Sequence, residues 1–104
     1  MGAIMNLQKH KRIVNKKMIQ ECRKTYCEYC GGRANCEPHH VHTVGSGGGD
    51  IRENLIQLCR SCHIQAHSGS ISKTECITII AEREGITTDE VYVINRRAKG
   101  YDVC

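Results

Sequence analysis

The segment CRSCHIQAH, residues 59–67, joins two cysteines to two histidines. Cys59 and Cys62 are separated by two residues, which is the spacing of a metal-binding knuckle. The run that follows is expected to be helical and to end at the Ser-Gly pair after it. On a helix, His63 and His67 lie one turn apart and present their imidazoles on one face. The segment therefore predicts a helix with a metal at its start, and it makes His63 and His67 candidates for a second metal site.

A second pair of cysteines, Cys27 and Cys30, has the same spacing and precedes two glycines that permit a sharp turn. Two such pairs supply four thiolates, which is enough for a closed structural zinc site. Disulfides are the alternative. The N-terminal stretch has no apolar signal-peptide run, so a reducing cytoplasm is expected, and there a metal site is favoured. Zinc would also stabilise a chain that has no Trp, no Phe and only four Tyr.

The other four of the eight cysteines lie outside these pairs. Cys22 and Cys76 fall at apolar positions of expected helices and are predicted to be small core residues. Cys36 adjoins a cluster of histidines and is an alternative ligand for the four-thiolate site. Cys104 has no predicted role.

An antiparallel hairpin is expected between the cysteine pairs. Its first strand is predicted at residues 38–44 and its second at residues 54–58. Between them GSGGGD, residues 45–50, predicts a long flexible loop. The hairpin and the helix after it form the predicted core of the fold.

The stretch EPHHVH, residues 37–42, carries three of the six histidines on the first predicted strand. Successive strand residues face opposite sides, so His39 and His40 can share one site only if the strand is distorted or ends there. We expect a distortion near Pro38-His39. By the same alternation His42 is predicted to face solvent, with a phosphate contact or a spare ligand as alternatives.

Helices are expected on both sides of this core. A basic N-terminal arm, residues 9–26, contains an amphipathic helix from Asn15 to Lys24. A C-terminal extension, residues 70–99, carries two capping-box signals, which predict two helices. The second of these contains a β-branched run that also suits a strand, and a helix is preferred. The whole chain, residues 1–104, is expected to form a single domain with its core at residues 27–67.

The formal net charge of +4 is unevenly distributed. Residues 9–24 hold a run of basic side chains with one acid, Glu21. Such a run suits a phosphate backbone, and a solvated helix face is an equally good interpretation. No apolar run is long enough to span a membrane. The candidate contacts to nucleic acid are Lys16, Lys17, Arg23, Lys24, Arg96 and Arg97.

Taken together, CEYC, EPHHVH, GGGD, ENLIQLC and CRSCHIQAH resemble the HNH endonuclease family in order and spacing. The resemblance covers about residues 27 to 67. It implies an α+β fold with a ββα-metal (His-Me finger) core, a structural zinc held by four cysteines, and flanking N- and C-terminal helices. It also implies a catalytic divalent cation between the first strand and the helix.

Position by position, the resemblance implies that His39, His63 and His67 bind the catalytic ion. His40 corresponds to the general base, and Asn54 to the residue that holds the long loop and so orients that base. Many family members have aspartate where this chain has His39, so the metal is left open among Mn²⁺, Mg²⁺, Ni²⁺ and Zn²⁺. Glu37 is either a partner of a ligand or only an acid at the strand start.

The function implied by the resemblance is metal-dependent hydrolysis of DNA, expected to be double-stranded, with 5′-phosphate and 3′-hydroxyl products. One active site per chain predicts nicking, and double-strand cutting would need a homodimer or successive nicks. Small members occur in phage and mobile elements, so partners in phage packaging or restriction are compatible. The alternative is a non-catalytic zinc module that binds nucleic acid or protein. This alternative gives no function to His40.

Overall fold

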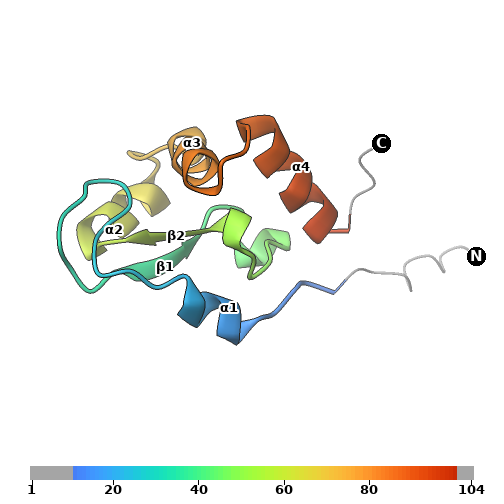
Figure 1. Ribbon diagram of the computed structural model, residues 1–104, viewed down its shortest axis with the longest axis horizontal. Helices are drawn as coiled ribbons and strands as arrows, with labels where there is room; N and C mark the ends of the chain where they lie inside the picture. Colours follow the sequence, from blue (N-terminus) through green and yellow to red (C-terminus); the bar gives the residue numbers. More distant parts are fainter. Residues whose placement is uncertain (1–10, 101–104) are drawn as a thin grey trace, which may run out of the picture.

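A two-stranded antiparallel sheet lies at the centre of the fold, as the computed structural model shows for residues 11–100 (Figure 1). Strand β1 is Glu37–His40 and strand β2 is Leu55–Leu58. Their register runs from Glu37 opposite Leu58 to His40 opposite Leu55. Every residue of β2 is buried, because helices α2 and α3 both contact this strand. The α+β class predicted from the sequence is confirmed.

Helix α2, Arg60–Ser68, begins directly after β2 and packs against both strands. It ends at Gly69, whose φ of 91° is the left-handed conformation that favours glycine. The predicted unit of hairpin followed by helix is therefore confirmed. It places the two histidines of α2 over the sheet.

Strand β1 is shorter than predicted. It ends at His40, and the chain then turns into a loop that contains a 3₁₀ turn, Val44–Ser46. The pairing of β1 with β2 continues without interruption through Pro38 and His39, so the predicted distortion near these residues is wrong. The strand accommodates its neighbouring histidines by ending there.

The flanking helices lie on different sides of the hairpin in Figure 1, with α3 and α4 above it and α1 below it. Helices α3, Lys73–Glu84, and α4, Thr88–Ala98, both begin with the predicted capping boxes. Helix α1, Lys16–Glu21, is shorter than the predicted Asn15–Lys24 helix.

The first residues of the predicted N-terminal arm and Cys104 lie outside the described residues. Within residues 11–100 no helix has the length and apolarity to cross a membrane.

The core forms between the sheet, α2 and the two C-terminal helices. Aliphatic side chains of β2 and α3 supply its largest fully buried members. Cys22 and Cys76 are buried, as predicted. The aliphatic residues with the lowest exposure are Leu55, Ile56, Leu58, Ile77, Ile80 and Val91.

Glu28, between the first two paired cysteines, ties that turn to the rest of the fold. Its backbone N–H donates to Gln57 O, and its carboxylate accepts from the N–H of the same residue, both at 2.8 Å. Arg83 of α3 donates to both carboxylate oxygens at 3.0 and 3.1 Å and to Leu55 O at 3.0 Å. This ion pair is largely buried, since the Glu28 side chain is 5% exposed.

The loop between the strands is packed and hydrogen-bonded, contrary to the flexible loop predicted from its glycines. The Asn54 amide, fully buried, donates to His42 O and Gly49 O at 3.0 Å and accepts from the His42 N–H at 2.6 Å. Gly48 is pressed against this bridge. A Cβ added at Gly48 would lie 1.8 Å from His42 O and 2.9 Å from Asn54 Nδ2, so only glycine fits there.

Gly48→Ala should therefore destabilise the protein, because the methyl group overlaps backbone that the Asn54 amide holds in place. We expect the free energy of unfolding to fall by about 1–3 kcal/mol, or a melting temperature lower by roughly 4–8 °C per kcal/mol. Gly45→Ala is the matched control, since a Cβ at Gly45 meets no atom within 4 Å. Thermal unfolding followed by circular dichroism measures both, and equal melting temperatures would refute the packing argument.

Candidate metal and active site

The four paired cysteines converge on one point. The Sγ atoms of Cys27, Cys30, Cys59 and Cys62 all lie within 4.8 Å of one another, and those of Cys30 and Cys59 are 3.9 Å apart. Four thiolates about 2.3 Å from a tetrahedral zinc would be about 3.8 Å apart, so the cluster fits that ion. All seven cysteines among residues 11–100 are free. The disulfide alternative is therefore wrong for the described part of the chain.

The backbone of the first knuckle favours thiolates. The Cys30 N–H donates to Cys27 Sγ and the Gly32 N–H donates to Cys30 Sγ, each at 3.4 Å. Burial raises the pKa of Cys27, but backbone hydrogen bonds, that of Cys30 first, lower it to about 6. Cys36 is not part of the cluster and donates to Ala34 O at 3.6 Å, so its alternative role as a ligand is wrong.

Three histidines form a second cluster between β1 and α2. The ligand nitrogens of His39, His63 and His67 lie within 4.8 Å of one another, and the Nε2 atoms of His63 and His67 are 3.1 Å apart. Two nitrogens bound to one ion at about 2.1 Å would be roughly 3.0–3.4 Å apart, so the spacing fits a shared metal. Burial lowers the pKa of His39 to about 4, helped by His63 and His67, which keeps its lone pair available at neutral pH.

Glu37 supports one of these histidines from the side opposite the cluster. Its Oε1 lies 2.7 Å from His63 Nδ1, and this hydrogen bond holds the pKa of Glu37 below its usual value. With its Nδ1–H donated to the carboxylate, His63 presents the Nε2 lone pair to His67. Of the two interpretations of Glu37, partner of a ligand is the one that the geometry supports. Three imidazoles with a carboxylate behind one of them suit zinc, nickel or manganese.

A cavity of about 210 Å³ opens beside the histidine cluster. His39 and His40 both border it, although they are neighbours on one strand. The end of β1 at His40 makes this compatible with the alternation of strand side chains. The residues that line the cavity are Pro38, His39, His40, Thr43, Val44, His63 and His67.

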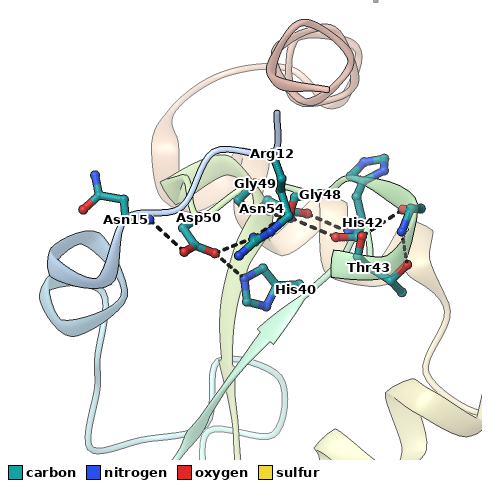
Figure 2. Close-up of polar contacts among 10 residues, drawn as sticks. Arg12, Asn15, His40, His42, Thr43, Gly48, Gly49, Asp50 and Asn54 are labelled. Carbon is teal, nitrogen blue, oxygen red and sulfur yellow. Dashed lines mark hydrogen bonds and ion pairs between the residues drawn. The ribbon is translucent and has the colours of Figure 1, made fainter. Parts of the chain in front are cut away.

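His40 is paired with a carboxylate and stands outside the cluster of three histidines. Its Nε2 lies 2.8 Å from Asp50 Oδ1 (Figure 2). Asp50 is 2% exposed and also accepts from Arg12 and from the backbone of Asn15. Burial opposes ionisation of Asp50, but the hydrogen bonds from Asn15, His40 and Arg12 lower its pKa to about 2. Because an ionised Asp50 only accepts hydrogen bonds, a neutral His40 must carry its proton on Nε2. Its Nδ1 is then unprotonated and keeps its lone pair.

Comparison with known proteins identifies the part of the chain that carries both clusters. Residues 27–69 match the model of the family described as HNH endonuclease. This segment belongs to the HNH endonuclease family. The HNH segment contains both cysteine pairs, the three clustered histidines, His40 and Asn54, and it leaves out α1, α3 and α4.

Two relatives share parts of this sequence. The type IV methyl-directed restriction enzyme EcoKMcrA of Escherichia coli K12 is 34% identical over 67 residues, which is 56% of this chain and 24% of the enzyme. The COX1/OXI3 intron 2 protein of Saccharomyces cerevisiae is 27% identical over 55 residues, 41% of this chain and 6% of that protein. The chain thus matches about a quarter of the first relative's length and much less of the second's.

His42 does not join the cluster of His39, His63 and His67. It is 5% exposed, and its ring packs edge-on against Tyr92 of α4 with a centroid distance of 6.2 Å. The prediction that it faces solvent is wrong, because β1 ends two residues earlier and the alternation of strand side chains no longer applies. Burial, with Lys73 and Lys99 nearby, lowers the pKa of His42 to about 4.

The predicted nucleic-acid contacts occupy two separate places. Lys16 and Lys17 are exposed on α1, Arg23 is exposed beyond its end, and Lys24 lies 5.9 Å from the centre of the Tyr26 ring. The exposed Arg96 and Arg97 lie in the last turn of α4. In Figure 1 the two groups are on different sides of the hairpin.

Sequence reasoning missed three residues near the site. Lys73, in the first turn of α3, lines a cavity of about 130 Å³ that His39 and His67 also border. Arg12 belongs to the basic run, yet its guanidinium is bound to Asp50 and to Gly48 O, each at 2.9 Å. Asp50 itself ends the glycine run. The available signal in the sequence was that Asp50 is the only acid in the predicted loop, residues 45–50.

Replacing one cysteine ligand tests the four-thiolate site. The wild-type protein should contain one tightly held zinc ion per chain, and Cys59→Ser should lose both the ion and the folded state, because bound zinc contributes about 10 kcal/mol or more. Cys36→Ser is the control, since Cys36 lies outside the cluster and serine can still donate to Ala34 O. Elemental analysis and circular dichroism provide the measurements. A Cys59→Ser protein that folds without zinc would contradict the assignment.

Glu37→Gln tests the support of the histidine cluster. Loss of the carboxylate behind His63 should weaken divalent metal binding by about 10- to 100-fold. Glu82→Gln removes an exposed acid on α3 and should leave the affinity unchanged. Calorimetric titration of the zinc-loaded protein with Mn²⁺ or Ni²⁺ measures the difference. Equal affinities in both variants would exclude this role for Glu37.

Proposed function

We propose that this protein is a metal-dependent endonuclease that hydrolyses phosphodiester bonds in double-stranded DNA. It would nick one strand at a time and leave 5′-phosphate and 3′-hydroxyl ends. The proposal is based on one observation. His40 borders the same cavity as His39, His63 and His67, yet it is bound to Asp50 and is not one of the three clustered ligands. A base beside a metal site is what hydrolysis by an activated water needs.

In this proposal the histidine cluster holds the divalent ion. When bound, that ion neutralises the charge that develops on the phosphate and on the leaving oxygen. His39 contributes a nitrogen from β1, and His63 and His67 contribute theirs from α2. Glu37 keeps the ring of His63 turned toward its partners.

The chain's own chemistry is proton removal by His40. Its Nδ1, which carries the lone pair, takes a proton from water in the cavity, and the resulting hydroxide attacks phosphorus. The bond from phosphorus to the 3′ oxygen breaks, and that oxygen leaves with a proton from water. Asn54 acts at a distance, since its amide holds the loop that carries Asp50.

The four-cysteine cluster has a separate task in this proposal. Four thiolates complete a tetrahedral zinc and leave no position for water or phosphate, so this ion would be structural. Its ligands flank the hairpin on both sides, with Cys30 before β1 and Cys59 after β2. The zinc would therefore fix the geometry in which α2 faces β1.

Basic side chains near the cavity favour a nucleic-acid substrate. Lys73 lines the smaller cavity, of about 130 Å³, which His39 and His67 also border. The pKa of Lys99 is lowered by burial and by the neighbouring charges of Lys73 and Arg96. Positive charges gathered in this way attract a phosphate backbone. We propose that the other basic residues predicted from the sequence also contact DNA phosphates: Lys16, Lys17, Arg23, Lys24 and Arg97.

A non-catalytic zinc module is the competing proposal. It accounts for the four cysteines, but it does not explain the pairing of His40 with Asp50 or of His63 with Glu37.

The number of chains needed for cleavage is a further part of the nuclease proposal, because one site per chain cuts one strand. Cleavage of both strands would then need two chains or two successive nicks. Restriction, the activity for which EcoKMcrA is named, is compatible with either.

A plasmid assay tests the proposed function. The zinc-loaded protein should convert supercoiled DNA to open circles with Mn²⁺, Mg²⁺, Ni²⁺ or Zn²⁺, and DNA ligase should reseal the nicks if they carry 5′-phosphate and 3′-hydroxyl ends. His40→Ala should be slower by about 10²- to 10⁴-fold, because the water loses its base.

Thr78→Ala on the exposed side of α3 is the control, and it should nick as the wild type does. Absence of nicking with all four metals by folded protein would refute the enzyme proposal. A His40→Ala variant as fast as the wild type would show that another group is the base.

A further inference from the structure

We infer that Asp50 is the positioning residue for His40, and that the leading segment, residues 11–15, holds Asp50 in place. The inference rests on the proposed nuclease function, since it concerns the base of that reaction. It adds to the active site a segment that lies before the HNH segment, residues 27–69. The geometry points to a chain of contacts from the leading segment through Asp50 to the imidazole.

The carboxylate of Asp50 is fixed at both oxygens. Oδ1 lies 2.8 Å from His40 Nε2 and accepts from Arg12 Nη1 at 2.9 Å. Oδ2 accepts from the backbone N–H of Asn15 at 2.8 Å. Figure 2 shows these three groups converging on the carboxylate from separate directions. The carboxylate cannot rotate without losing one of these bonds, so its position dictates where the His40 ring lies.

The leading segment is itself seated on the loop between the strands. Arg12 Nη1 donates to Gly48 O at 2.9 Å, and the Asp50 N–H donates to Ile13 O at 3.0 Å. A Cβ added at Gly49 would lie 3.1 Å from Ile13 Cβ, so the two backbones pack closely. These contacts join residues more than thirty positions apart and place the segment beside the site.

The consequence for His40 concerns its tautomer. An ionised carboxylate accepts a proton from Nε2, which leaves Nδ1 unprotonated and able to take the proton of water. Without Asp50 the ring could turn about its χ angles and place the proton on either nitrogen. Asp50 would thus act through His40 and need not touch the DNA or the ion.

Arg12 has a second interpretation, as one more contact to DNA phosphates. The two interpretations predict different kinetics. A phosphate contact contributes to binding, so its loss raises KM and leaves kcat unchanged. A positioning role leaves DNA binding intact, so loss of Arg12 lowers kcat at an unchanged KM.

The experiment compares Asp50→Asn, Arg12→Ala and Arg12→Lys with the wild type as zinc-loaded full-length chains in the nicking assay. Asparagine keeps the shape but must point its amide N–H₂ either at His40 and Arg12 or at the Asn15 N–H. In the first orientation it favours the tautomer with the proton on Nδ1. We expect kcat to fall by about 10²-fold or more with KM for DNA within about twofold.

Arg12→Ala should lower kcat less than Asp50→Asn does, and Arg12→Lys should recover part of the loss because lysine can still donate to Asp50. Lys11→Ala, an exposed neighbour in the same segment, removes an equal charge and should leave kcat unchanged. If Arg12→Ala raises KM and keeps kcat, or if Asp50→Asn keeps kcat, the inference is overturned.

A second measurement does not depend on nuclease activity. Nitrogen-15 NMR of histidine-labelled protein at about pH 8, where a free imidazole is neutral, reports the His40 tautomer. The wild type should show Nε2–H, and Asp50→Asn should show Nδ1–H or a mixture, with the His40 signals identified by their loss in His40→Ala. A wild type with Nδ1–H would refute the inference. The expected tautomers in a protein that nicks no DNA would refute only the proposed function.

Discussion

The convergence of four cysteines controls how the hairpin and α2 are arranged in the HNH segment. Cys27 and Cys30 precede the hairpin, and Cys59 and Cys62 lie where β2 passes into α2. Bringing their sulfurs within 4.8 Å of one another fixes where the hairpin begins and the direction in which α2 leaves it. Because α2 starts at that point, His63 and His67 face the strand that carries His39. The second cluster thus depends on the geometry of the first.

A different constraint places His40, the proposed base. The three clustered histidines come from β1 and α2, but the orientation of His40 depends on a loop that regular secondary structure does not define. That loop is closed by the Asn54 amide from inside and by Arg12 from outside. The two kinds of group at the site are therefore held by separate parts of the molecule. This separation lets the proposed ligand His39 and the proposed base His40 be neighbours in sequence without competing for an ion.

Local patterns made much of the fold predictable. Cysteine spacing, the capping boxes before α3 and α4, and the glycine after α2 each act within a few residues, so the sequence alone locates them. The same holds for the i,i+4 pair His63 and His67. Pattern reasoning therefore predicted the four-cysteine cluster and the histidine pair of the second cluster, and the family resemblance added His39 and the roles of the members.

Contacts between distant residues decided what the sequence could not predict. The end of β1 depends on the bridge from Asn54 to His42, so the alternation rule misplaced His42. The packing of the glycine loop depends on Ile13 and Arg12, more than thirty residues away, so its composition wrongly indicated flexibility. The pairing of Asp50 with His40 is of the same kind. Charge patterning alone also could not separate Arg12, which binds protein, from the lysines that follow it.

The buried pair of Glu28 and Arg83 extends the influence of the first cysteine knuckle to the C-terminal helices. Loss of the ion that the four thiolates fit would release Glu28 from β2 and leave the Arg83 guanidinium, which also pairs with Glu84, without one of its carboxylate partners. Removing one partner from a largely buried ion pair is destabilising, so α3 should lose stability together with the knuckle. The supply of zinc in the cell would then determine how far the whole chain, and not only the knuckle, is folded and protected from proteolysis.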